Sequence, residues 1–582
     1  MNDNGTFVLH PLDYLAFGTF FVVLSAIGYW AGRRERTSPD EYFLAGRKLP
    51  WYVVGGSFIA SNISSEHFIG MIGAAFIYGQ CVAMSCWGNV GSFTFLIWLF
   101  IPFLLASKVF TIPEFLQRRF NSTLRQFFAF VTVVSNVVAF LAAVLYGGGL
   151  ALNKLFGWDL GFAIVLLGVV AGTWAIYGGL SSVAWTDLFT VIVMIFGGVL
   201  VTVLGLQMLA GESGSLVDGF QTMLERNQAL EGPWKEAVQE TARNIARRDQ
   251  YNRLCVIQPI THRLQPWTNL IFGVFSVSIW YNVLNQFMIQ RVLGAKDAYH
   301  ARMGIVLAGF TQVFLPAIIV IPGLILFALH PEVLLLPWKD LPKEADQTFV
   351  SLVQTLVPAG LRGLVLAGLF GAIQSTVNSV LNSTATIVTL DIYRQLFRPN
   401  ASSKHLVKVG IATSVIVLLV AIVLAQFIGL LGESLFVYIQ TLYAFFAPPF
   451  SAVFLLGILW RRINAIGATA AVFSGFALGI AIKVYVAMAP AHPDWIEPYS
   501  NQAALNWTFC VLVCTAVSLL TPRPARQQVT DQLVFNWRKL NIFNNLGDRW
   551  YTSVVTWWLL FVVTIVALVL IFSGLMFPTS SL

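Results

Sequence analysis

The chain has 582 residues, of which 57% are hydrophobic and only 11% are charged. Soluble domains carry roughly 25% charged residues, so this composition excludes a soluble globular protein and predicts an all-α polytopic membrane protein. The formal net charge of +8 does not indicate a nucleic-acid partner, because membrane topology accounts for where the basic residues lie.

About fourteen apolar segments are long enough to cross the ~30 Å hydrocarbon core of a bilayer as helices. In chain order they are 12–31, 50–78, 81–106, 124–152, 159–177, 184–210, 267–290, 303–329, 359–389, 406–429, 433–459, 463–488, 504–521 and 553–577. The first segment is too long for a signal-peptide core and no cleavage site follows it, so we expect it to be retained.

Lys and Arg predict the orientation of these segments. If the N-terminus lies outside and the segments alternate, most of the 35 Lys and Arg residues fall in inside loops. This is the bias that membrane insertion imposes on short loops, and a missed helix would invert it. We therefore expect a multi-pass protein of the cell membrane with both termini outside.

The polar segment 211–266 is the longest interruption of the apolar pattern and divides the chain. We interpret it as a solvated connector outside the membrane, with an amphipathic surface helix over 234–248. The chain is predicted to begin with one helix and an inner loop (1–49), followed by a first repeat of five helices (50–210) and the outer loop (211–266). A second repeat of five helices (267–460) and three C-terminal helices (461–582) complete it.

Two spans have polar interruptions, and each opens one of the two halves. The span 50–78 contains Ser57, Ser61, Asn62, Ser64, Ser65, Glu66 and His67, and the span 267–290 contains Asn282, Asn285 and Gln286. A charge near the bilayer centre costs roughly 2.5–3.5 kcal/mol, so these side chains are expected to face a protein interior or a wet cavity. Interrupted spans in corresponding places are the sequence mark of an inverted-repeat transporter.

Further polar residues lie on the ninth and sixth spans. Ser375 and Ser379 are one helical turn apart on the ninth span, as are Asn378 and Asn382. Hydroxyl, amide and carbonyl oxygens are suitable ligands for a small hard cation. Asp187, near the start of the sixth span, either caps that helix or binds a cation, and the residues alone favour the cap.

Five motifs resemble the solute:sodium symporter family, in its sodium/glucose cotransporter branch. They lie at 59–70, 111–115, 177–187, 285–291 and 381–393, in the family's order and spacing. The resemblance implies a leucine-transporter-type fold of five plus five inverted helices with flanking helices. It also implies a symporter and not an enzyme.

The resemblance implies a main sodium site made of backbone carbonyls at the break of the first core helix and hydroxyls on the ninth span. The matching positions are Ala60, Ile63, Ala372, Ser375 and Thr376. Some family members bind a second sodium through positions that are Asp187 and Ser64 here. Ala372 replaces a hydroxyl found in some of those members, which leaves the stoichiometry open.

The implied solute site matches the sugar-transporting branch in part. The matching positions that contact or gate the sugar are Asn62, His67, Tyr281 and Gln440. Cys86, Gln312 and Asn282 stand where the branch has Glu, Lys and Trp, and we expect Asn89 to supply hydrogen bonds in place of those lost. The resemblance thus implies a symporter that imports sodium and a small polar solute, a sugar or polyol.

Several alternatives stay open from the sequence. The solute is alternatively an organic acid, an amino acid or a sialic acid, but the positions above contain no Lys or Arg for an anion. His67 offers proton coupling, although a hydrogen bond to a sugar hydroxyl is the favoured interpretation. A solute sensor or a sodium leak channel is the alternative class. The expected partners are sodium, the solute and the lipid bilayer.

Overall fold

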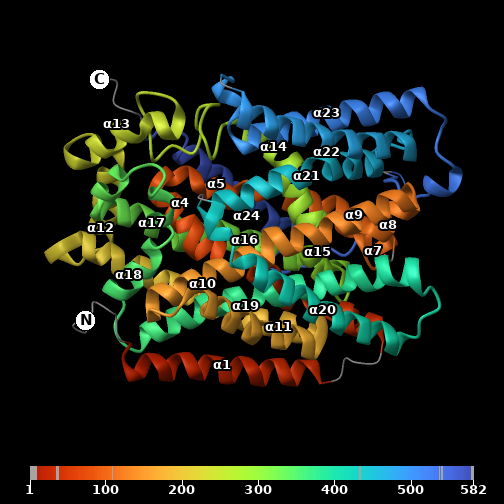
Figure 1. The fold of residues 1–582 in the computed structure, drawn as a ribbon, viewed down its shortest axis with the longest axis horizontal. Coiled ribbons are helices and arrows are strands. Elements are labelled where there is room, and N and C mark those ends of the chain that lie inside the picture. The colour runs from red at the N-terminus through yellow and green to blue at the C-terminus, as the bar shows by residue number, and fades with distance from the viewer. Residues whose placement is uncertain are drawn as a thin grey trace.

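The computed structural model describes residues 9–33, 38–107, 109–431, 434–489, 491–536, 538 and 542–577. Most of these residues are in helices, and the extended contacts among them are isolated bridges instead of a sheet. The long helices lie side by side, with α1 (Pro11–Gly32) at one edge and α22 (Ala465–Met488) and α23 (Tyr499–Leu520) at the opposite edge (Figure 1). The predicted all-α class is confirmed.

The other long helices, together with the short ones that the site uses, lie between these edges (Figure 1). They are α3 (Trp51–Asn62), η2 (Glu66–Met71), α4 (Ile72–Tyr78), α9 (Ser122–Ser135), α10 (Ala143–Phe156), α11 (Leu160–Ala210), α14 (Thr268–Gly273), η8 (Trp280–Leu284), α15 (Gln286–Leu293), α16 (Ala298–Leu329), α19 (Leu361–Ile387), η10 (Val388–Phe397), α20 (Ser403–Ala425), α21 (Leu435–Leu459) and α24 (Val554–Ile571).

In the described residues, eleven helical stretches are long and apolar enough to cross a membrane, and a pair bent by 53° makes a twelfth. The difference from fourteen arises at two places. The predicted span 50–78 breaks after α3, and its second half continues into a stretch that ends at Ser107. The predicted span 159–177 corresponds to the first part of α11, where the apolar stretch Leu160–Thr173 is counted separately from the eleven. The count of fourteen therefore remains a prediction.

The start of α1 and the end of α24 lie at the same end of the molecule as the segment 211–266 (Figure 1). The backbone N–H of Val256 donates to the carbonyl of Phe572, just past α24, at 2.7 Å. This contact agrees with the prediction that both termini lie on the same side of the membrane. That this side is the outside is predicted from the Lys and Arg distribution. Four of the inside-loop residues behind that assignment lie outside the described residues: Arg34, Arg36, Lys108 and Lys539.

Both polar-interrupted spans are broken helices. Ile63 is extended (φ −82°, ψ 119°) directly after α3. Asn285 is extended (φ −68°, ψ 120°) between η8 and α15. The last carbonyls before such a break lose their helical partners. The two breaks lie in the spans that open the predicted halves, as the polar residues in these spans indicated.

Residues 211–250 of the segment 211–266 are mostly exposed, whereas residues 251–266 are largely buried, so this last part is not the solvated connector that the sequence predicted. The segment contains α12 (Leu216–Gln228) and α13 (Gly232–Ala246), the second of which matches the predicted amphipathic helix. Beyond α13, Arg253 is buried, and its guanidinium donates to the carbonyls of Phe76 (2.7 Å) and Ile77 (2.8 Å). Since these carbonyls end α4, the arginine supplies the partners that the helix terminus lacks. The segment is thereby fixed to the second half of the first broken span, at the end of α4.

Replacement of Arg253 by alanine is expected to lower the free energy of unfolding by about 3 kcal/mol, because buried carbonyls lose charge-assisted hydrogen bonds. Thermal unfolding of the detergent-solubilised protein measures the change. Arg243→Ala is the matched control: its side chain is 79% exposed and pairs with Asp249, so a change below about 1 kcal/mol is expected. Equal effects of the two substitutions would contradict the role assigned to Arg253.

Candidate functional site

A buried polar cluster joins α3, α11 and α19 beside the first helix break. The Ser57 hydroxyl donates to Asp187 Oδ2 (2.6 Å), and the Ser375 hydroxyl donates to Asp187 Oδ1 (2.6 Å). The hydroxyls of Ser61 and Ser379 lie 2.8 Å apart, so they connect α3 to α19 directly. The serine stripe on the ninth span thus faces the broken helix.

Arg291 of α15 brings the second broken helix into this cluster. Its Nη2 lies 3.3 Å from Asp187 Oδ2, and its Nε donates to the Ser57 hydroxyl at 2.6 Å. Arg291 also donates to the Ser379 hydroxyl and to the carbonyl of Phe287. The charged side chains of the pair are each only 1% exposed. The carboxylate and the guanidinium therefore neutralise one another where the two breaks meet.

Asp187 does not cap a helix, contrary to the interpretation favoured from the sequence. The kink in α11 occurs at Gly179 (φ 60°, ψ −160°), where a Cβ would lie 2.4 Å from the carbonyl oxygen of Tyr42. The helix therefore restarts at Leu180, and Asp187 lies in its interior with side-chain partners instead of backbone N–H groups. Ser64, the other residue matched to a second sodium site, accepts the backbone N–H of Glu66 at 3.1 Å.

The residues matched to the main sodium site lie on the two elements that meet at this cluster. The N–H of Ser64, which would bond to Ala60 in a continuous helix, donates instead to His67 Nδ1 at 3.4 Å. Across from α3, Ser375 and Thr376 are buried on α19, and Thr376 Oγ1 has no hydrogen-bond partner among the described residues. Freed carbonyls and an unpartnered hydroxyl are neutral oxygens, which fit a small hard cation.

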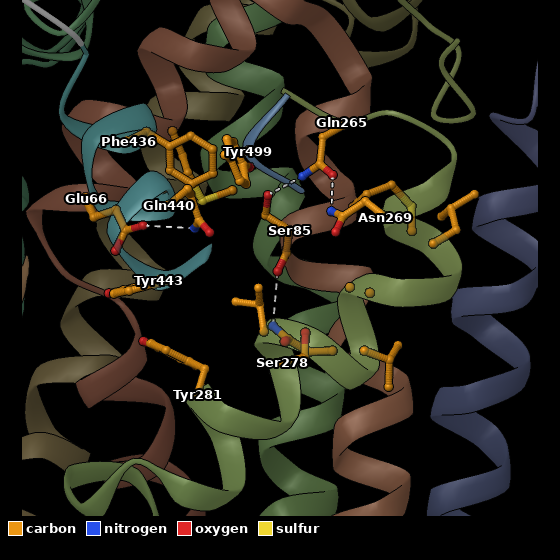
Figure 2. Close-up of a pocket in the computed structure, with 18 of the residues that line it drawn as sticks. Glu66, Ser85, Gln265, Asn269, Ser278, Tyr281, Phe436, Gln440, Tyr443 and Tyr499 are labelled. Atoms are coloured by element: carbon orange, nitrogen blue, oxygen red, sulfur yellow. Dashed lines mark hydrogen bonds between the residues drawn. The ribbon is translucent and has the colours of Figure 1, made fainter. Parts of the chain in front are cut away.

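A pocket opens beside the break, with an empty volume of about 890 Å³ when the open space at its mouth is included. Asn62, Glu66 and His67 line one side of it. Its other polar lining residues are Ser85, Asn89, Gln265, Asn269, Ser278, Tyr281, Gln440, Tyr443 and Tyr499 (Figure 2). These side chains are hydroxyls and amides for the most part, so the pocket is suited to a solute with many hydrogen-bonding groups.

The structure brings five of the predicted solute residues together and leaves three apart. Asn62, His67, Asn89, Tyr281 and Gln440 line the pocket. Cys86 and Gln312 are buried away from its lining. Asn282 lies behind the wall, where its Nδ2 donates to Asn89 Oδ1 (3.0 Å) and to the Ser92 hydroxyl (2.9 Å). It holds Asn89 in place instead of facing the pocket.

Several lining residues were not found from the sequence. Glu66 Oε1 accepts a hydrogen bond from Gln440 Nε2 at 3.2 Å, which gives this glutamate a place on the pocket wall. Its position next to His67 in the break was the available signal. Ser85, Gln265, Asn269, Ser278 and Tyr443 carry no motif, and Gln265 falls in the segment interpreted as a connector.

The pocket is closed at the end opposite the segment 211–266. The Tyr281 hydroxyl donates to Asn62 Oδ1 at 3.1 Å. The rings of Tyr281 and Tyr443 lie 5.4 Å apart, and Phe140 stacks on Tyr443 at 4.8 Å. Val256, Gln265 and Pro266 line the other end, so this segment forms part of the pocket wall there.

The model of the sodium:solute symporter family matches residues 42–475. The chain belongs to the sodium:solute symporter family. It is 32% identical over 546 residues to the sodium/glucose cotransporter of Vibrio parahaemolyticus, covering 91% of this chain and 95% of that one. It is 30% identical over 570 residues to the human sodium/myo-inositol cotransporter, covering 93% of this chain and 78% of that one.

A solved structure of a Na⁺-coupled sialic acid symporter, in a substrate-bound outward-open state, shares the fold. Its TM-score is 0.69 at 20% identity, covering 88% of this chain and 99% of that one. The family predicted from the motifs is confirmed. As a member of the sodium:solute symporter family, the chain is a multi-pass membrane protein that couples solute movement to sodium, in a family of transporters and not of enzymes.

Tyr281→Phe is expected to loosen the closed end of the pocket. The substitution keeps the stacked ring but removes one neutral hydrogen bond, worth about 0.5–1.5 kcal/mol, so opening at this end should become about two- to tenfold more frequent. Hydrogen exchange of the α15 backbone amides, compared with the wild type, measures this. Tyr485→Phe, at a side chain that is 45% exposed, is the control. Unchanged exchange in Tyr281→Phe would argue against a closing role for its hydroxyl.

Proposed function

We propose that the protein is a sodium symporter that imports a small neutral polyhydroxy solute, a sugar or polyol, by alternating access. The observation that carries this proposal is the pocket beside the broken helix. Glu66 is the one acidic residue among the described residues that line it, and Lys and Arg are absent from that lining. An anionic solute would lack a counter-charge there, whereas hydroxyls find many partners. The names of the glucose and myo-inositol relatives support the same class.

We propose the main sodium site at Ala60, Ile63, Ala372, Ser375 and Thr376. Support comes from the break after α3 and from the unpartnered hydroxyl of Thr376. Bound there, sodium would hold α3 and α19 together and keep Asn62 and His67 in place for the solute. Its entry down the gradient supplies about 2.3 kcal/mol per 100 mV for each charge.

We propose that one sodium ion enters per cycle. A second ion at Asp187 would compete with Arg291, which lies 3.3 Å from the carboxylate in this structure. Ser64, its predicted co-ligand, is engaged by the N–H of Glu66. An added ion would therefore carry an uncompensated positive charge into a buried site.

The proposed architecture is a five-plus-five inverted repeat over 50–210 and 267–460, with one helix before it, three after it, and about fourteen spans in all. The corresponding positions of the two breaks support it. The proposed orientation has both termini outside, on the evidence of the Lys and Arg distribution. In this orientation the pocket faces outward.

Proteoliposomes with an inward sodium gradient test the proposed function. Radiolabelled glucose and myo-inositol are expected to accumulate above the outside concentration, and replacement of sodium by choline should abolish accumulation. Preloaded unlabelled solute should drive counterflow of label, which a channel or sensor would not support. Uptake that is unaffected by choline, or a sodium flux that is independent of solute, would overturn the proposal.

Thr376→Ala is expected to raise the sodium concentration for half-maximal uptake by about tenfold, which corresponds to about 1.4 kcal/mol for a lost ligand oxygen. Thr376→Ser should retain the wild-type value because it keeps the hydroxyl. Thr389→Ala is the matched control, since its hydroxyl is also buried and without a partner among the described residues but lies outside α19, in the following η10. Sodium titration of initial uptake rates measures all three. A single ion predicts a Hill coefficient near 1.

A further inference from the structure

We propose that Gln265, together with Ser85 and Asn269, forms a second solute-recognising wall, so that the outer segment 211–266 takes a direct part in choosing the solute. The inference rests on the proposed function, because it concerns the same pocket. It assigns recognition to a residue outside the motifs that identify the family.

The three side chains form a hydrogen-bonded row on the pocket lining. Gln265 Nε2 donates to the Ser85 hydroxyl at 2.8 Å, and Gln265 Oε1 accepts from Asn269 Nδ2 at 2.6 Å. Figure 2 shows this row across the pocket from the pair formed by Glu66 and Gln440. The solute space therefore lies between two polar walls that originate in different parts of the chain.

The row keeps hydrogen-bonding capacity for a ligand. The Ser85 hydroxyl accepts from Gln265 and still has its own hydrogen, and the Gln265 amide has a second N–H. Glu66, on the opposite wall, offers carboxyl oxygens, one of which already accepts from Gln440. A polyhydroxy ring can therefore accept hydrogen bonds on one side and donate them on the other. This arrangement supplies the capacity that Cys86 and Gln312 do not, since both lie off the pocket lining.

A buried chain of contacts holds Gln265 in register with the broken helix. His262 Nδ1 accepts the backbone N–H groups of Leu264 (3.1 Å) and Gln265 (2.9 Å). Its Nε2 lies 3.0 Å from the Tyr251 hydroxyl, which donates to the carbonyl of Tyr78 at the end of α4. Because Nδ1 accepts twice, the ring proton resides on Nε2. Burial lowers the pKa of His262 to about 3, so this neutral form persists at physiological pH.

The consequence is that the two walls are mechanically linked. Glu66 and His67 begin the helical stretch that continues through α4, and Gln265 is attached to the far end of that stretch through Tyr251. On the other side, the Ser85 carbonyl accepts from Asn89 Nδ2 at 3.0 Å, so the row continues into a predicted solute residue. A solute that bonds to both Gln265 and Glu66 would therefore connect the two walls directly.

A purely structural hydrogen bond would affect folding and all solutes alike, whereas a recognition residue changes selectivity. The test uses the full-length protein in proteoliposomes and compares sodium-driven uptake of the preferred solute, glucose or myo-inositol, with that of its monodeoxy analogues. Gln265→Ala is expected to raise KM for the parent solute by about five- to tenfold while the half-maximal sodium concentration stays unchanged. One deoxy analogue lacks the hydroxyl that faces Gln265. For this analogue, the KM of Gln265→Ala should equal the KM of the wild type.

Gln265→Glu, which keeps the acceptor and removes the amide donor, should shift the preference among the analogues without a large change in maximal rate. Gln239→Ala, on the exposed face of α13, is the matched control and should match the wild type. If the wild type shows sodium-driven uptake and Gln265→Ala leaves KM unchanged, or weakens all analogues equally with a lower melting temperature, this inference fails and the proposed function stands. Absence of sodium-driven uptake of any solute in the wild type would overturn both.

Discussion

The buried ion pair between Asp187 and Arg291 is the interaction on which the two broken helices depend. A single charge at this depth would be expensive, and removal of either partner would leave the other uncompensated, at a cost of about 3–5 kcal/mol. Ser57 and Ser375 donate to the carboxylate, and Ser57 accepts from the guanidinium. The pair therefore satisfies its charges only when α3, α11, α15 and α19 are in register. It specifies the relative placement of the two breaks more than it adds stability.

This register also determines what an ion can do at the neighbouring site. Ser375 belongs both to the proposed sodium ligands and to the partners of Asp187, since its hydroxyl hydrogen points to Oδ1 and its lone pairs remain available. The pair beside it is neutral overall, so it would not neutralise a sodium ion bound at the proposed site, and the stability of that ion would depend on the carbonyls at the break. Such a site responds to small movements between α3 and α19, as coupling requires.

The features predicted correctly from the sequence are those that depend on a local pattern of residues. Polar residues in apolar spans, such as Asn62 and Asn285, marked both breaks, and the ordered motifs led to the correct family. The features that were missed depend on contacts between distant segments. Asp187 looked like a cap because its partner Arg291 lies 104 residues away. Gln265 looked like part of a solvated loop because the burial of this region depends on Arg253 meeting the carbonyls at the end of α4. The local sequence around Asp187 or Gln265 does not indicate either of these long-range contacts.

Alternating access requires that the pocket open at either end for a similar, modest free energy. One end is closed by the hydrogen bond from Tyr281 to Asn62 and by the aromatic rings beside it, and at the other end Gln265 bonds to Ser85 and Asn269 across the lining. Each such bond contributes about 1 kcal/mol net. One sodium charge crossing a membrane at 100 mV supplies about 2.3 kcal/mol, which is enough to shift a balance of this size. The segment 211–266 thus takes part in the same balance as the closure by Tyr281.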